Sequence, residues 1–117
     1  MLASAPQLLD RPIGDFVNSL PWGFFLAVHI ALFVVGATFA ARRLGVGDRL
    51  AGTGFTLFAV AELLYMTYHV NITQFLFAHT LAEVVDAGAF VALFAALAVR
   101  TREPARAEAG REVGALR

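Results

Sequence analysis

The chain has 117 residues, of which 59% are hydrophobic, with nine acidic residues, nine basic residues and no cysteine. The absence of cysteine excludes disulfides, thiolate metal sites, iron–sulfur clusters and covalently attached c-type haem. The balanced charge, without a basic patch, gives no indication of nucleic-acid binding. The apolar residues lie in long runs and exceed the share found in ordinary soluble domains, which predicts an integral membrane protein.

The N-terminal segment, residues 1–20, has neither the basic start nor the continuous apolar core of a signal peptide. We interpret it as a retained segment that lies outside the membrane or at its interface. The first membrane span is predicted over about residues 22–41. Pro21 suits the start of a helix and Trp22 suits the lipid headgroup level, while Arg42 and Arg43 follow the apolar run.

The second span is predicted over about residues 50–70, and it opens with small residues that allow close helix approach, at positions 52–54. The short linker 71–74 predicts a tight antiparallel hairpin with the third span, residues 75–99. Residues 21–99 thus form the transmembrane domain. Residues 100–117 form a charged tail, either a solvated helix or disordered, with interruptions expected near Pro104 and Gly110. The predicted fold is all-α, a three-transmembrane-helix bundle with short loops.

The arginines predict the orientation of the chain in the cytoplasmic membrane. Three lie in or beside the loop after the first span, and five follow the third span, whereas the opposite side has only Arg11. Because positively charged segments stay in the cytoplasm, we expect the N-terminus outside and the C-terminus cytoplasmic.

Polar residues recur on one face of each predicted span. Glu62, Tyr65 and His69 share a face of the second span at helical spacing, and His79, Glu83 and Asp86 share a face of the third. In the first span, His29 lies in line with the small residues Gly36 and Ala40. All three polar faces are expected to point inward.

The expected depths of these residues also agree. At about 1.5 Å per residue from the outer boundary, His29 lies roughly 10 Å deep, His79 roughly 7 Å, and Glu62 and Glu83 roughly 13 Å. Tyr65 falls near ~9 Å, His69 near the surface and Asp86 close to the midplane. The histidines and glutamates are therefore predicted to converge in the outer half of the membrane.

This cluster has no counter-charge within the spans, because every arginine lies outside them and lysine is absent. Acids in such a place must be protonated, hydrogen-bonded or neutralised by a bound cation. Imidazole with carboxylate suits iron, zinc, copper or manganese, and helical bundles build metal sites from such residues. We predict His29, Glu62, His79 and Glu83 as metal ligands. Tyr65 and His69 would support the ligands or line the entry, and Asp86 would be a buried proton site.

Three alternatives remain open. A b-type haem could take axial ligands from His29 paired with His69 or His79. Glu62, Glu83 and Asp86 could instead serve proton or cation translocation. The third alternative is a cofactor-free accessory or anchor subunit, in which the polar residues only hydrogen-bond across helices. No nucleophile–base pair or phosphate loop is recognisable, so catalysis by this chain alone is not predicted.

In size and number of spans the chain resembles the cytochrome b-type membrane anchors of succinate dehydrogenase. It lacks those anchors' histidine followed at a distance by an Asp-Tyr pair, so the resemblance is confined to architecture. The absence of lysine excludes a retinal-linked protein. Three spans bury little surface alone, so we expect the partners to be the lipid bilayer and either other membrane subunits or further copies of this chain.

Overall fold

The computed structural model describes residue 17 and residues 19–115, with side chains described as far as residue 103. Over this range the chain forms three helices, α1 (Trp22–Gly45), α2 (Arg49–His69) and α3 (Phe75–Ala115). Each contains a stretch that is long and apolar enough to cross a membrane, in agreement with the three predicted spans. The N-terminal segment interpreted as interfacial, residues 1–20, lies almost entirely outside the described residues.

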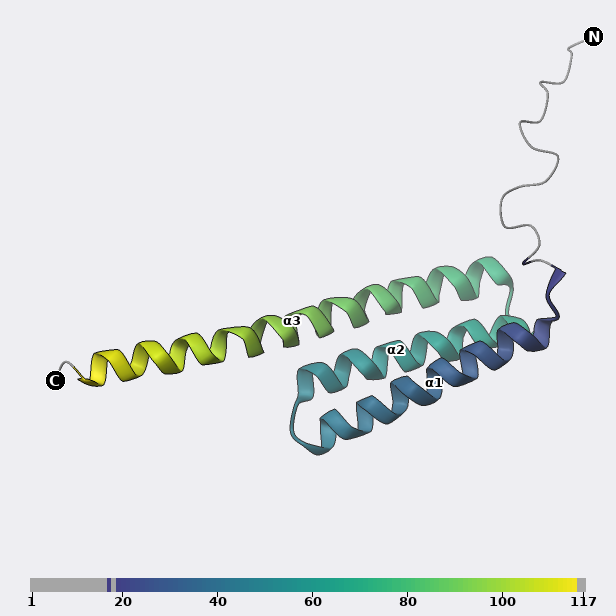
Figure 1. Ribbon diagram of the computed structural model, residues 1–117. Helices are drawn as coiled ribbons and strands as arrows, with labels where there is room; N and C mark the ends of the chain where they lie inside the picture. The colour runs from purple at the N-terminus through teal and green to yellow at the C-terminus, as the bar shows by residue number, and fades with distance from the viewer. Residues whose placement is uncertain (1–16, 18, 116–117) are drawn as a thin grey trace, which may run out of the picture.

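Helix α2 is the centre of the arrangement. Both α1 and α3 pack along α2, and over the described residues no Cα atom of α1 lies within 8 Å of a Cα atom of α3 (Figure 1). The short connections at residues 46–48 and 70–74 make each neighbouring pair antiparallel, as predicted for the second and third spans. The three helices therefore form an open layer, in which α2 has a neighbour on two sides.

Small residues make the helix–helix contacts. At Gly36 of α1, an added Cβ would lie 2.7 Å from the ring of Phe58 on α2. At Gly54 of α2, an added Cβ would lie 2.7 Å from the side chain of Leu93 on α3. These approaches confirm the predicted role of the small residues. The buried hydrophobic residues of the described chain are all alanines: Ala40, Ala51, Ala59, Ala61, Ala78, Ala82, Ala89 and Ala96.

Large apolar side chains lie on the outside of the layer instead of in its core. Leu76, Val84, Val91 and Phe94 of α3 are all more than half exposed. In water such a surface would promote aggregation, whereas in a bilayer it contacts lipid. The distribution of side chains therefore fits a membrane-embedded protein.

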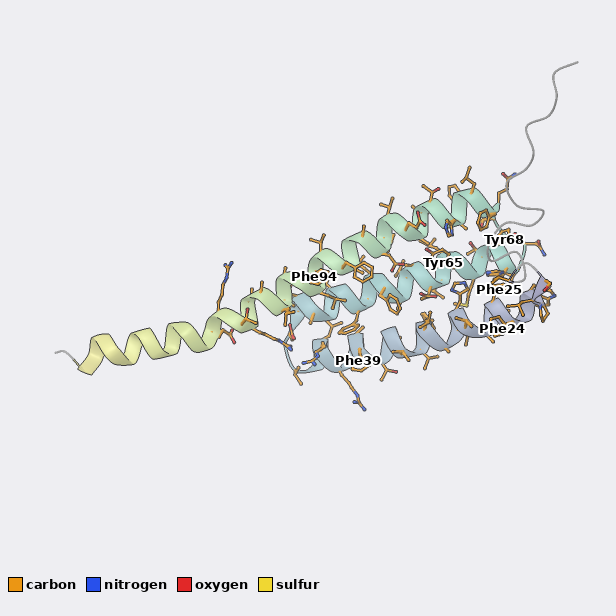
Figure 2. The ribbon with its side chains drawn as sticks, turned by 45° about the horizontal axis from the view of Figure 1, so that its top comes forward. Phe24, Phe25, Phe39, Tyr65, Tyr68 and Phe94 are labelled. Carbon is orange, nitrogen blue, oxygen red and sulfur yellow. The ribbon has the colours of Figure 1, made fainter. Side chains whose placement is uncertain are left out.

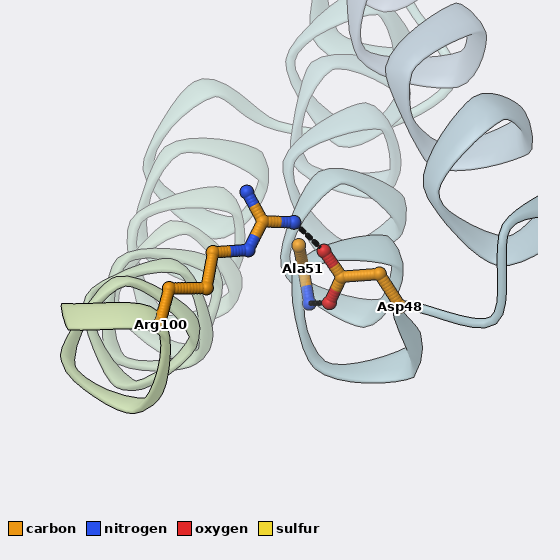
Figure 3. Close-up of polar contacts among 3 residues, drawn as sticks. All are labelled: Asp48, Ala51 and Arg100. Atoms are coloured by element: carbon orange, nitrogen blue, oxygen red, sulfur yellow. Dashed lines mark hydrogen bonds and ion pairs between the residues drawn. The ribbon is translucent and has the colours of Figure 1, made fainter. Parts of the chain in front are cut away.

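The turn between α1 and α2 is joined to α3 by one side chain. Gly47 has a φ of +79°, which a glycine adopts without steric cost, and it places Asp48 at the start of α2. Asp48 Oδ1 accepts a hydrogen bond of 3.2 Å from the backbone N–H of Ala51, and its Oδ2 accepts one from Arg100 Nη2 (Figure 3). Asp48 thus caps α2 and pairs with α3.

Helix α3 is longer than its predicted span and continues without a break to Ala115 (Figure 1). The interruptions expected near Pro104 and Gly110 are therefore wrong for the described backbone. The surrounding alanine, arginine and glutamate residues have high helix propensity, which favours continuation of the helix despite the N–H missing at Pro104.

Candidate functional site

A partly buried hydrogen bond connects α1 and α2. His29 Nδ1 lies 2.6 Å from Glu62 Oε2. The Glu62 side chain is only 5% exposed, and that of His29 is 19% exposed. Glu62 is the one buried charged residue among those whose side chains are described. The predicted proximity of His29 and Glu62 is confirmed.

Ring contacts between α1 and α2 surround this hydrogen bond. The His29 ring stacks on Tyr65, with ring centroids 5.1 Å apart, and lies 5.3 Å from the His69 ring. His69 also stacks on Phe25 of α1 at 5.7 Å. His69 was predicted near the membrane surface, and in the structure its ring lies beside that of His29.

Helix α3 contributes a second histidine–glutamate pair. His79 Nε2 lies 3.0 Å from Glu83 Oε1, one helical turn away. The ring of His79 stacks on Phe75 at 5.0 Å and meets the edge of Tyr65 at 5.4 Å. Tyr65 therefore contacts both His29 and His79, one on each side of α2.

All three histidines of the chain border one pocket of about 520 Å³, which we call the histidine pocket. It lies beside α2 between α1 and α3, at the end of the layer near the α2–α3 turn. Figure 2 shows Phe25, Tyr65 and Tyr68 gathered at this end, with Phe39 and Phe94 farther along the layer. The pocket is lined by Val17, Leu20, Trp22, Phe25, His29, Tyr65, Tyr68, His69, Phe75, Ala78 and His79.

Asp86 is separate from this pocket. It lies on α3 one turn beyond Glu83, and its Oδ1 is buried without a hydrogen-bond partner among the described residues. An unpaired buried carboxylate oxygen is costly unless it is protonated or finds a partner. The buried proton site that the sequence predicts at this position stays a prediction.

The four predicted metal ligands form two pairs instead of one cluster. His29 meets Glu62, and His79 meets Glu83, with Tyr65 between the two histidines. Within the described part of the chain, no three histidine or acidic side chains are grouped closely enough to hold a metal ion. The structure thus brings the histidines to one pocket, and each carboxylate holds one of them.

Apart from Tyr65, the aromatic walls of the pocket were not predicted. Tyr68, for example, contacts both His69 and Phe75. Their spacing relative to the histidines was the available signal, since Phe25 precedes His29 and Phe75 precedes His79 by one helical turn. The pairing of Asp48 with Arg100 was also missed, because residues 52 positions apart carry no local signal.

Comparison with known proteins supplies no relative: no protein-family profile matches the sequence, and neither a curated protein nor a solved structure is detectably similar to it.

Proposed function

We propose that this protein is a small membrane subunit that binds a metal centre, either a transition-metal ion or haem iron, through imidazole nitrogens in the histidine pocket. The observation that carries the proposal is the arrangement around His29. Its Nδ1 is held by buried Glu62, and its ring lies 5.3 Å from that of His69, in a pocket that His79 also borders.

The carboxylates support this reading by leaving one nitrogen of each histidine for a metal. A metal-ligating histidine almost always donates its other ring N–H to a carboxylate, a backbone carbonyl or water, which fixes the ring and raises its basicity. Glu62 occupies Nδ1 of His29 and leaves Nε2, whereas Glu83 occupies Nε2 of His79 and leaves Nδ1. Glu62 and Glu83, predicted as ligands, thus become the residues that orient the ligands.

The distance between the two nearest histidines also supports a shared metal. Metal–imidazole bonds are about 2.1 Å long, so two imidazoles that bind one ion at roughly 90–110° have ring centroids about 4.5–5.5 Å apart, whereas two axial imidazoles of haem lie opposite each other at more than ~6 Å. The centroids of His29 and His69 are 5.3 Å apart. A bound ion would take these two first, and His79, beyond the Tyr65 ring, is the remaining histidine of the pocket.

The pocket suits a cofactor in its size and walls. Its volume of about 520 Å³ falls in the range of cofactor sites, which are mostly apolar with a few convergent polar groups. A transition-metal ion and haem iron would both bind to imidazole nitrogens, but they differ in their absorption spectra. Haem gives an intense Soret absorption band, and a bound ion gives a metal stoichiometry without that band.

The test is an absorption spectrum with elemental analysis of protein purified in detergent without chelators. We expect a Soret band, or about one equivalent of iron, zinc, copper or manganese, that is lost in His29→Ala and in His69→Ala. Glu62→Gln should weaken binding about 10- to 100-fold, as the loss of a supporting carboxylate does elsewhere. Asp48→Asn, at the other end of α2, is the control and should keep full occupancy.

A colourless, metal-free protein that stays so after incubation with haem and with each of the four ions would overturn the proposal. The function would then be that of a cofactor-free subunit, in which the same residues only join the helices.

We further propose that the histidine pocket lies at the outer side of the cytoplasmic membrane. The support is the distribution of arginine, since Arg42, Arg43 and Arg49 share the far side with the arginines that follow the third span. The N-terminus is then outside and the C-terminal part of α3 cytoplasmic.

A further inference from the structure

Glu83 is an exposed acid within a helix that is apolar enough to cross a membrane. Its side chain is 62% exposed. Among the described residues it pairs with His79, whose side chain is itself 42% exposed. In water such a pair would contribute little and need no explanation. In a bilayer, a carboxylate on an uncovered helix face is costly and calls for a partner.

The depth of Glu83 makes contact with the aqueous phase difficult. Glu83 lies nine positions after Gln74, which corresponds to about 13 Å along a helix that begins near the membrane surface. Asp86 lies one turn deeper, and its buried Oδ1 has no hydrogen-bond partner within the described chain. Two carboxylates thus follow each other on α3 toward the midplane of the membrane.

Among the described residues, no other helix covers this face. Helix α1, the other outer helix, packs on α2, and none of its described Cα atoms lies within 8 Å of a Cα atom of α3 (Figure 1). Thr80 and Ala87 lie one turn before and one turn after Glu83, and both are exposed. Small side chains on both sides of an acid allow another helix to approach closely.

The charge of the missing partner can be inferred from this chain's own sequence. The arginines of the spans lie only at the ends far from Glu83 and the protein contains no lysine, so a second copy in the same orientation brings no arginine or lysine to the depth of Glu83. A second copy would instead place another Glu83 and Asp86 there. The complementary partner is therefore a different protein with a basic residue inside its membrane span.

We propose that the face of α3 around Glu83 binds a transmembrane helix of another protein that carries an arginine or lysine about one third of the way into the membrane. The basic side chain pairs with the Glu83 oxygen that His79 does not use. This interaction does not depend on metal binding in the histidine pocket.

The test uses the full chain in phospholipid vesicles with a synthetic leucine–alanine transmembrane peptide that carries one arginine about 13 Å from its outer end. Because the protein has no cysteine, Ile72→Cys in the exposed α2–α3 turn provides a single site for a fluorescent donor. Energy transfer to an acceptor on the peptide measures binding. We expect the arginine peptide to bind about tenfold more tightly than the same peptide with leucine.

Variants locate the contact. Glu83→Gln should remove the preference for arginine, whereas Glu62→Gln, which changes a buried acid on α2, should keep it. Glu83→Lys should reverse the preference and favour a peptide with glutamate at the same depth. This reversal cannot arise from a folding defect.

Two outcomes would overturn the proposal. One is equal binding of the arginine and leucine peptides to the unchanged chain. The other is energy transfer between two labelled copies of the chain that the arginine peptide does not compete away and that Glu83→Lys abolishes, because a second copy would then occupy this face.

Discussion

Arg100 of α3 donates to Asp48, the residue that caps the first turn of α2. The two oxygens of one carboxylate thus hold the start of one helix and the side of the next (Figure 3). The cap and the ion pair are separate interactions, and substitutions at Asp48 and Arg100 distinguish their contributions to stability.

Removal of the cap should cost more than removal of the ion pair. We expect Asp48→Ala to lower the free energy of unfolding by about 1 kcal/mol or more, because it loses the hydrogen bond to Ala51 N–H together with the ion pair. Arg100→Gln should cost less than ~1 kcal/mol, because the arginine is half exposed. Asp48→Asn keeps a capping oxygen and should resemble Arg100→Gln. Unfolding in mixed micelles with rising SDS measures all three, and an equal loss in Asp48→Ala and Arg100→Gln would contradict a role for the cap.

The two histidine–glutamate pairs should differ in their effect on stability. Glu62 is buried, so Glu62→Ala leaves a polar ring atom of His29 without its partner and should cost about 1–3 kcal/mol. Glu83 is exposed, and Glu83→Ala should change stability by less than ~1 kcal/mol. The same micelle titration on metal-free protein compares them. A larger loss from Glu83→Ala would contradict the greater contribution of the buried pair between α1 and α2.

The sequence predicted the helices better than their arrangement. Long apolar runs mark α1 and α2 within a few residues, because bilayer thickness sets the length of such runs. Helical spacing likewise predicts that His79 meets Glu83 on one face of α3. Local signals of this kind do not reveal that α1 and α3 both pack on α2 without touching each other, and this arrangement is what separates the four predicted ligands into two pairs.

The close approach at Gly54 can be tested against a second glycine of the same interface. An added Cβ at Gly54 would lie 2.7 Å from Leu93 and 3.2 Å from the backbone oxygen of Ala89, which cannot move without shifting α3. We expect the overpacking in Gly54→Ala to lower the free energy of unfolding by about 1–3 kcal/mol. The higher helix propensity of alanine offsets about 1 kcal/mol of this loss.

Gly88 of α3 is the matched control for Gly54. Its added Cβ would meet Leu57 at 3.6 Å, an ordinary contact, so Gly88→Ala should be neutral or slightly stabilising. Both variants are measured by unfolding in mixed micelles. Tolerance of alanine at both positions would show that the contact at Gly54 does not limit how closely α2 and α3 approach.

The proposed orientation can be tested with single cysteines, because the chain has none of its own. Ile72, in the turn after α2, is 73% exposed, and Val46, in the turn after α1, is 75% exposed, so the two sites are equally accessible and lie at opposite ends of the layer. If the arginine-rich side is cytoplasmic, a thiol reagent that does not cross membranes should label Ile72→Cys in intact cells and leave Val46→Cys unlabelled. Permeabilised cells should show labelling of both. Labelling of Val46→Cys alone in intact cells would reverse the orientation and place the histidine pocket on the cytoplasmic side, where its metal would come from the cytoplasm.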